Sequence, residues 1–80
     1  MAEEGAPAVV LDAQGLLCPL PVLRARRAMK EVPPGGLLKV LATDPGAVKD
    51  FQHFCEATGS TLVESSRDGD VFTFLIRKAG

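Results

Sequence analysis

Residues 37–59, LLKVLATDPGAVKDFQHFCEATG, predict a buried strand that leads directly into a helix. The run at 37–43 is almost continuously apolar, which is typical of a strand in the middle of a sheet. Asp44 is a good helix N-cap, Pro45 suits the first helical position, and Gly59 suits the C-terminal end. Apolar residues at three- and four-residue spacing then predict the inward face of the helix. These residues are Val48, Phe51, Cys55 and Thr58, with Phe54 alongside.

The same strand-to-helix order precedes this stretch. Residues 8–13, AVVLDA, predict a short strand, and helical spacing of apolar residues runs from Pro19 to about Val32. PPGG at 33–36 ends this helix. Because a crossover connects the two strands, we expect them to be parallel and the connection to be right-handed.

A hairpin of two strands completes the chain. Residues 61–67 and 71–78 flank RDGD, in which Asp68-Gly69 is a two-residue hairpin signal. The apolar residues that alternate toward one face of the last strand are Phe72, Phe74 and Ile76. The predicted order is β-α-β-α-β-β, an α/β (α+β) two-layer sandwich in which two helices cover one face of a four-stranded mixed sheet. We expect a single domain at 8–80 after a flexible N-terminal tail at 1–7.

The composition argues against several functional classes. Eighty residues, 46% of them hydrophobic, suffice for one small domain. A net charge of −1 and only four aromatic residues, all Phe, disfavour direct nucleic-acid binding. The acidic N-terminus does not resemble a secretory signal, and no apolar run is long enough to span a bilayer. With two cysteines and one histidine, we expect neither a disulfide nor a metal site. These features predict a cytoplasmic monomer without membrane contact.

Cys18 lies in a second informative stretch, GLLCPLPVLRARRAM at residues 15–29. If Pro19 is the first helical residue, Cys18 is the N-cap, because a residue before proline favours the extended backbone of an N-cap. Pro19 and Pro21 occupy first-turn positions, where the missing N–H groups cost little. The amide donors near the sulfur are then those of Leu20 and Val22. These amides and the helix dipole favour the thiolate, so we expect a lowered pKa and a reactive sulfur at Cys18.

The chain lacks the other groups of a complete cysteine enzyme. A cysteine nucleophile commonly needs a histidine base, and the only histidine, His53, lies on the polar face of the second predicted helix. Pro21 occupies the position three after Cys18, so no C-x-x-C pair is present. One activated sulfur without a second reactant is typical of a group carrier rather than a stand-alone hydrolase or oxidoreductase.

Other interpretations of the cysteines stay open. One alternative is that Cys18 is a small buried residue that only fills space in the core, although its place at a helix start favours reactivity. A redox-sensing module would use Cys18 as a reversibly oxidised thiol. In a plain interaction domain the cysteine would be incidental. We expect Cys55 to pack in the core, with a Cys18–Cys55 redox pair as a further alternative.

A basic patch follows Cys18 on the first predicted helix. One interpretation is a solvated helix face. The other is a docking surface for acidic partners, which would speed encounter and set orientation. The patch consists of Arg24, Arg26, Arg27 and Lys30.

These residues resemble the TusA/SirA family of small sulfur carriers. LDAQGLLCPLPVLRARRAM is similar to the family's leader into a Cys-Pro-x-Pro motif at a helix start. The likeness continues through the stretch at 37–59 and ends with FTFLIRK, covering about residues 9–78. It implies the two-layer sandwich described above. It also implies that Cys18 is the carrier residue, with Pro19, Leu20 and Pro21 supporting it. Asp44 and Asp50 match family positions after the second strand, and we interpret Asp44 as a helix cap.

The resemblance further implies a chemistry and a set of partners. Cys18 would accept sulfane sulfur as a transient persulfide from a cysteine desulfurase or a rhodanese, with no other cofactor. Acceptors in the family include a relay complex for 2-thiouridine in tRNA, DsrE- or TusD-like relay proteins of sulfur oxidation, and molybdenum-cofactor biosynthesis. The implied reaction is thiol–persulfide exchange, in which a thiol of low pKa also serves as a good leaving group.

Overall fold

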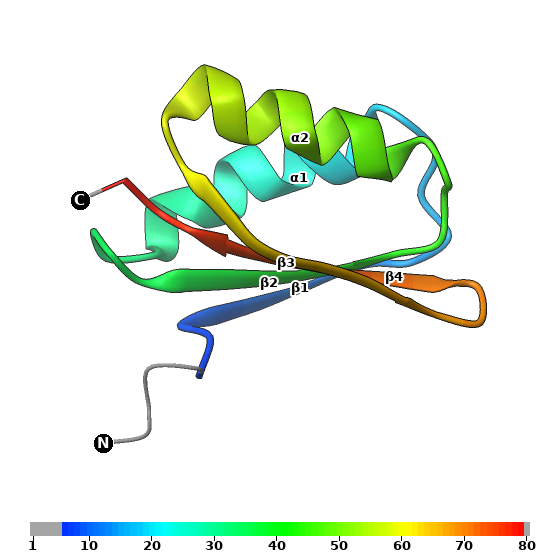
Figure 1. Ribbon diagram of the computed structural model, residues 1–80, viewed down its shortest axis with the longest axis horizontal. Coiled ribbons are helices and arrows are strands. Elements are labelled where there is room, and N and C mark those ends of the chain that lie inside the picture. Colours follow the sequence, from blue (N-terminus) through cyan, green and yellow to red (C-terminus); the bar gives the residue numbers. More distant parts are fainter. Residues whose placement is uncertain (1–5, 80) are drawn as a thin grey trace.

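The computed structural model describes residues 6–79, which form the predicted two-layer sandwich (Figure 1). Two helices lie on one face of a four-stranded sheet with the strand order β1-β2-β4-β3. β1 and β2 are parallel, and β4 is antiparallel to both of its neighbours. The elements are β1 (Val9–Ala13), α1 (Leu20–Ala28), the 3₁₀ helix η2 (Met29–Glu31), β2 (Leu37–Ala42), α2 (Ala47–Thr58), β3 (Thr61–Asp68) and β4 (Val71–Arg77). The predicted fold class and element order are therefore confirmed. Most of the predicted tail at 1–7 lies outside the described residues.

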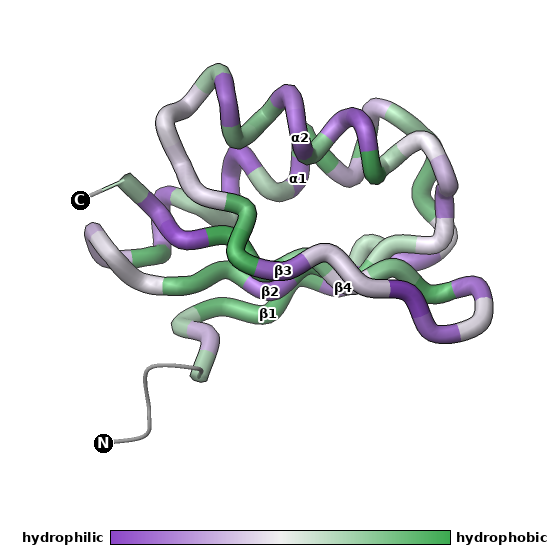
Figure 2. Tube along the Cα trace, viewed as in Figure 1, coloured by the Kyte–Doolittle hydropathy of each residue, from purple (hydrophilic) through white to green (hydrophobic). Residues whose placement is uncertain are grey.

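The core lies between the sheet and the helices. Phe51 of α2 is fully buried, stacks on Phe74 of β4 at a ring-centroid distance of 4.8 Å and meets Phe54 edge-on at 6.1 Å. Cys55 lies in this core as predicted, but Thr58 is exposed and does not belong to the inward face. β1 and β2 accordingly consist largely of hydrophobic residues, whereas hydrophobic and hydrophilic residues alternate along α1 and α2 (Figure 2).

The first helix is shorter than predicted. α1 begins at Leu20 with Pro19 as its N-cap, because the Leu20 N–H donates to the Leu17 carbonyl at 2.8 Å and closes a turn ahead of the helix. Cys18 therefore lies one residue before the N-cap and not at it. α1 ends at Ala28, and η2 tightens the last turn before the chain becomes extended at Val32.

The second helix also begins later than predicted. α2 starts at Ala47 with Gly46 as its N-cap, so neither Asp44 nor Pro45 takes its predicted position. The Asp44 carboxylate accepts the Gly46 N–H at 3.2 Å, one turn ahead of the helix. At the other end, Gly59 adopts φ 73° and caps α2 as predicted.

The hairpin turn is offset by one residue from its predicted position. Asp68 pairs with Val71, so the two loop residues are Gly69 and Asp70 and not Asp68 and Gly69. Gly69 has φ 63°, a value that glycine adopts at no steric cost. A register shift between Leu62 and Glu64 interrupts the β3–β4 pairing nearer the helix.

Candidate functional site

Cys18 lies where two loops meet at one edge of the sheet. β1 and β2 are parallel neighbours, so the loops that follow them emerge at the same edge. Two hydrogen bonds join these loops. The Gly15 N–H donates to Thr43 Oγ1 at 2.9 Å, and the Cys18 N–H donates to Asp44 Oδ2 at 2.6 Å. The backbone at Cys18 is therefore held by a carboxylate from a segment 26 positions further along the chain.

The sulfur itself contacts a second carboxylate. The Cys18 S–H donates to Asp50 Oδ2 with a sulfur–oxygen distance of 2.5 Å. Asp50 is the acidic residue in the first turn of α2. Cys18 is thus fixed twice, through its main chain by Asp44 and through its side chain by Asp50.

The two carboxylates reverse the expected pKa shift of Cys18. The hydrogen bond to Asp50 raises the pKa of the thiol, and desolvation and the negative charges of Asp50 and Asp44 raise it further. The predicted lowering is wrong because it considered only the helix dipole and the nearby amides. One of those amides, that of Leu20, donates to Leu17 O instead. The side chain of Cys18 is nevertheless exposed, so the thiol is both accessible and protonated at neutral pH.

The two prolines in this loop differ in their burial. Pro21, in the first turn of α1, is fully buried and anchors the helix start on the core. Pro19 is exposed beside Cys18. Leu20, between them, is exposed at the first position of the helix.

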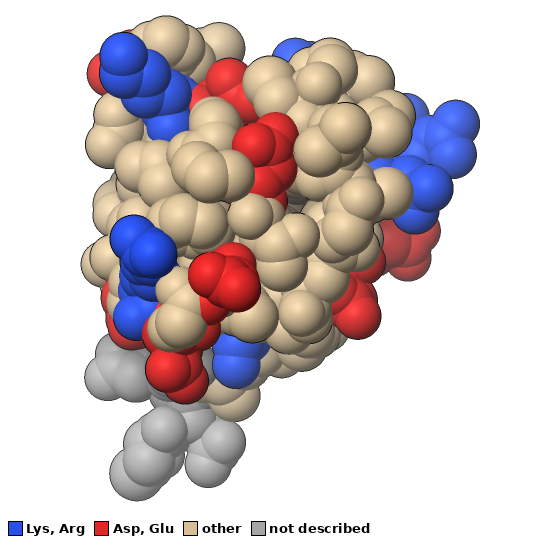
Figure 3. All heavy atoms as spheres, turned by 90° about the vertical axis from the view of Figure 1, so that its right-hand side faces the viewer, with Lys and Arg blue, Asp and Glu red and all other residues tan. Residues whose placement is uncertain are grey.

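Exposed leucines surround the cysteine along the chain. Leu17 is 71% exposed, Leu20 43% and Leu23 51%, whereas large apolar side chains are usually buried. Figure 3 looks onto this end of the molecule, where uncharged and acidic side chains lie together and most of the Lys and Arg side chains lie toward the margins. Exposed apolar side chains that lie together in a patch are typical of a protein–protein contact.

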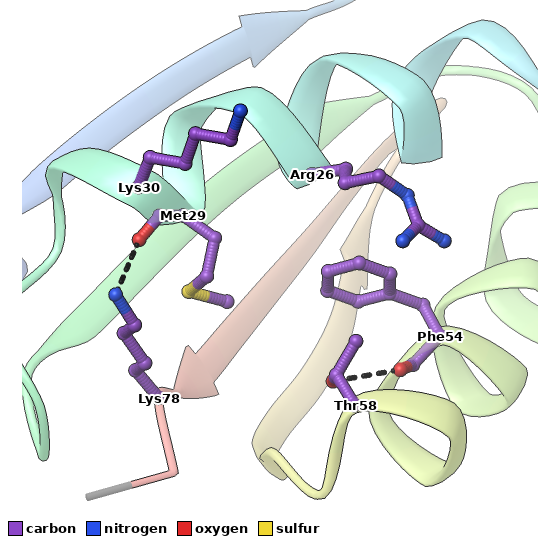
Figure 4. Close-up of a pocket in the computed structure, with 6 residues that line it drawn as sticks. All are labelled: Arg26, Met29, Lys30, Phe54, Thr58 and Lys78. Carbon is purple, nitrogen blue, oxygen red and sulfur yellow. Dashed lines mark hydrogen bonds between the residues drawn. The ribbon is translucent and has the colours of Figure 1, made fainter.

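The seam between α1 and α2 contains two hollows. The first, of about 260 Å³, lies next to the residues that adjoin Cys18 and is lined by Pro19, Val22, Arg26, Asp50, His53, Phe54 and Ala57. The second, of about 170 Å³, lies further along the seam and is lined by Arg26, Met29, Lys30, Phe54, Thr58 and Lys78 (Figure 4). Arg26 and Phe54 border both hollows, and the guanidinium carbon of Arg26 lies 5.9 Å from the centre of the Phe54 ring.

The four residues of the predicted basic patch fall into two pairs with different surroundings. Arg26 and Lys30 border the seam, whereas Arg24 and Arg27 are exposed and line neither hollow. Lys78 adds a cation that the patch did not include, and its ammonium group donates to the carbonyls of Met29 at 3.1 Å and Val32 at 2.9 Å. Figure 4 shows the first of these bonds closing one side of the second hollow.

The remaining candidate residues are Cys55 and His53. Cys55 is buried, and burial raises the pKa of its thiol. His53 is exposed, as predicted, and borders the hollow next to Asp50. Within residues 6–79, no three His, Cys, Asp or Glu side chains are grouped closely enough to hold a metal ion. None of the helices in the described part of the chain has the length and apolar character needed to cross a membrane.

Comparison with known proteins identifies the family. The sequence model of the family described as Sulfurtransferase TusA matches residues 9–78. The chain belongs to the TusA family. Among its relatives, the sulfur carrier protein TusA of Allochromatium vinosum is 52% identical over 69 residues, which cover 86% of this chain and 91% of the relative. The sulfur carrier protein TusA of Pseudomonas syringae pv. tomato is 45% identical over 69 residues, covering 86% and 82% of the two chains.

A solved structure shares the TusA-family fold. The crystal structure of a SirA-like protein from Desulfitobacterium hafniense superposes with a TM-score of 0.77 at 28% identity. The match covers 90% of this chain and 99% of the other. The resemblance to the TusA/SirA family is therefore confirmed.

Sequence reasoning missed the contact between Asp50 and the sulfur. The sequence indicates Asp50 only as a residue that matches the family, and Asp44 as a family match and a helix cap. One signal pointed toward both: parallel neighbouring strands bring their following loops to one edge, so Asp44 and the start of α2 had to lie near Cys18. The exposed leucines at 17, 20 and 23 were a second missed signal, because they are large apolar residues beside a proline-rich helix start.

Proposed function

We propose that the protein is a sulfur carrier, which accepts sulfane sulfur as a persulfide on Cys18 and passes it to an acceptor protein. The names of its relatives in the TusA family support this role. The observation that carries the proposal is the placement of Cys18: its thiol is exposed at one end of the molecule and is held there by Asp44 and Asp50. Cys55, by contrast, is buried in the core.

The surroundings of Cys18 favour a carrier over a self-sufficient enzyme. Cys55 is packed in the core beneath α2 and is not available as an internal acceptor of sulfur. The second thiol of each exchange must therefore come from another protein. A redox sensor is less favoured, since sensor cysteines are thiolates of low pKa and the pKa of Cys18 is raised.

The surface around Cys18 suits brief docking to such proteins. Leu17, Leu20 and Leu23 offer exposed apolar side chains near Cys18 in the chain, and Arg26 and Lys30 border the seam between α1 and α2. We propose a cysteine desulfurase or a rhodanese as donor and a DsrE- or TusD-like relay protein as acceptor. The proposal extends to transfer in tRNA 2-thiolation, sulfur oxidation or molybdenum-cofactor pathways, with the carrier acting as a cytoplasmic monomer.

The test is sulfur loading followed by intact mass. The protein is incubated with a cysteine desulfurase and cysteine, or with a rhodanese and thiosulfate. We expect a gain of one sulfur atom on the wild type and on Cys55→Ala, and no gain on Cys18→Ser. Absence of a gain with both donors, or an unchanged gain in Cys18→Ser, would contradict the proposal.

The docking role of the basic helix has its own test. Arg26→Glu and Arg27→Glu should slow loading by a protein donor, and added salt should reduce the difference from wild type because it screens exposed charges. Asp70→Lys changes the charge of the distant hairpin and serves as the control. If the arginine variants load at the wild-type rate, these arginines are only a solvated helix face.

A further inference from the structure

The contact between Cys18 and Asp50 joins a thiol and a carboxylate without any intervening group. The sulfur–oxygen distance is 2.5 Å, and the carboxylate comes from a different element than the thiol. Asp44 fixes the main chain of Cys18 at 2.6 Å, so the sulfur cannot leave Asp50 by movement of the loop backbone unless that bond breaks. The sulfur is therefore held in a defined position, with its hydrogen directed at a carboxylate oxygen.

We propose that Asp50 is a catalytic residue of sulfur transfer, which accepts the Cys18 proton as the sulfur attacks and returns it to the leaving thiolate. This inference rests on the proposed carrier function and adds a proton acceptor to it. General bases must lie within hydrogen-bond reach of the proton that they remove, and Asp50 meets that condition.

The transfer step balances without an oxidant or a reductant. The S–H bond of Cys18 breaks, and its proton moves to the Asp50 carboxylate. The freed electron pair forms a bond to the outer sulfur of the donor persulfide, the donor S–S bond breaks, and the donor leaves as a thiolate. That thiolate takes the proton from Asp50. Cys18 then carries a persulfide and the donor is a thiol; unloading to an acceptor thiol follows the reverse course.

The other titratable and charged groups near the pair are less suited to this task. Asp44 uses its carboxylate oxygens for the main-chain N–H groups of Cys18 and Gly46. His53 and Arg26 border the same hollow as Asp50, and the hydrogen bond of the Cys18 thiol goes to Asp50. An arginine stays protonated and cannot accept the proton. Asp50 is therefore the group to which the proton passes.

A second consequence concerns the carrier between transfers. While Asp50 is ionised, the thiol stays protonated, since the carboxylate raises its pKa. A protonated thiol is a poor nucleophile toward unrelated electrophiles. The same carboxylate that protects the sulfur at rest takes its proton when a donor persulfide is in place.

The pH dependence of loading tests the proposal. Loading of wild type and Asp50→Asn is measured from pH 6 to 8 with cysteine persulfide as the donor, and the product is quantified by intact mass. If Asp50 accepts the proton, the number of protons on the pair does not change across this range, so the wild-type rate is independent of Cys18 ionisation. Asp50→Asn must first lose the proton to water, and its rate should rise about tenfold per pH unit. The ratio of the two rates cancels the titration of the donor.

The expected result is a wild-type to Asp50→Asn rate ratio that falls about 100-fold between pH 6 and pH 8, two units at the slope of a single deprotonation. Parallel profiles, with a constant ratio, would show that Asp50 only positions the sulfur and would overturn the proposal. If the wild type gains no sulfur at all, the carrier function fails rather than the role of Asp50.

Three control variants keep the result interpretable. Glu56→Gln makes the same chemical change on the exposed side of α2 and should load like wild type. His53→Gln removes the other titratable group that borders the hollow and should leave the flat wild-type profile intact; a slope in this variant would assign the proton to His53 instead. Asp50→Glu retains a carboxylate and should restore part of the flat profile. Far-ultraviolet circular dichroism verifies that each variant is folded.

Discussion

Replacing Asp44 with alanine removes the link between the two loops that hold Cys18. In the wild type, one carboxylate oxygen accepts the Cys18 N–H at 2.6 Å and the other accepts the Gly46 N–H at 3.2 Å. Both bonds are lost in Asp44→Ala, and the bond from the Gly15 N–H to Thr43 Oγ1 then remains to join the loop after β1 to the loop after β2. We therefore expect a lower free energy of unfolding and a less firmly positioned Cys18 side chain.

The size of the loss follows from the nature of the bonds. A hydrogen bond to a charged group contributes about 1.5–3 kcal/mol to the free energy of unfolding. Asp44 is half-buried, so water replaces part of the contribution, and the longer bond to Gly46 adds less than the shorter bond to Cys18. We expect a total loss of about 2 kcal/mol, which is below the roughly 3–6 kcal/mol that two fully buried bonds of this kind would supply. For a domain of this size, that corresponds to a fall in Tm of roughly 8–16 °C.

Urea unfolding followed by circular dichroism measures this loss directly. A domain of 80 residues has a free energy of unfolding of about 4–12 kcal/mol, so Asp44→Ala should remain folded without urea. Asp70→Ala, in the exposed hairpin, is the matched control and should change stability by less than about 0.5 kcal/mol. A loss in Asp44→Ala as small as in this control would refute the reasoning that the carboxylate joins the two loops. The pKa of Cys18 provides a second readout and should fall, because the charge of Asp44 raises it in the wild type.

Three further predictions concern the cysteines and the core. Iodoacetamide in large excess, which overcomes the low reactivity of a protonated thiol, should label Cys18 but not Cys55 in the folded protein, and both thiols after unfolding, as counted by intact mass; labelling of Cys55 in the folded protein would contradict its burial. Phe51→Ala should cost about 3–5 kcal/mol of stability in urea unfolding, and Phe51→Leu less than about 1.5 kcal/mol; equal losses would argue against the close stack on Phe74. Stability should fall as the pH rises above about 8.5, the usual thiol value, because the raised pKa values of both cysteines make the folded protein hold these protons more tightly than the unfolded chain. A variant with Cys18→Ser and Cys55→Ala should lose part of this pH dependence, and an unchanged slope in urea midpoints from pH 7 to 10 would contradict the assignment.

Local patterns carried most of the information about the fold. The apolar run at 37–43 predicted the central strand, which is β2 with neighbours on both sides, and Gly59 predicted the end of α2. The spacing of Phe51 and Cys55 placed both in the core. These features depend on residues that are near one another in the chain, so periodicity and capping rules are sufficient to find them.

The electrostatics of the site depended on contacts that local patterns do not contain. Asp50 lies 32 positions from Cys18, and its distance from the sulfur is set by how α2 packs against the loop after β1. The proline at a helix start predicts that the helix dipole acts on Cys18. No local pattern predicts that two carboxylates from another segment lie beside it. Their combined effect is opposite to that of the dipole, and so the direction of the Cys18 pKa shift was predicted wrongly although the residue itself was found. The exact start of α1 was missed for a similar reason, because a single turn closed by Leu17 moved it by one residue.

The two ends of the described chain leave the sheet at the edge opposite the sulfur. The Ala8 N–H donates to the Leu37 carbonyl and the Lys78 N–H to the Gly36 carbonyl, both at the beginning of β2, whereas Cys18 is bonded to Asp44 beyond its end. The six residues of β2 separate these edges by roughly 20 Å. In Figure 1, the start of β1 and the end of β4 lie on the left and the loop that leads into α1 lies on the right. A fusion partner, a fluorescent protein or a surface tether joined before β1 or after β4 therefore leaves the sheet at the end away from Cys18.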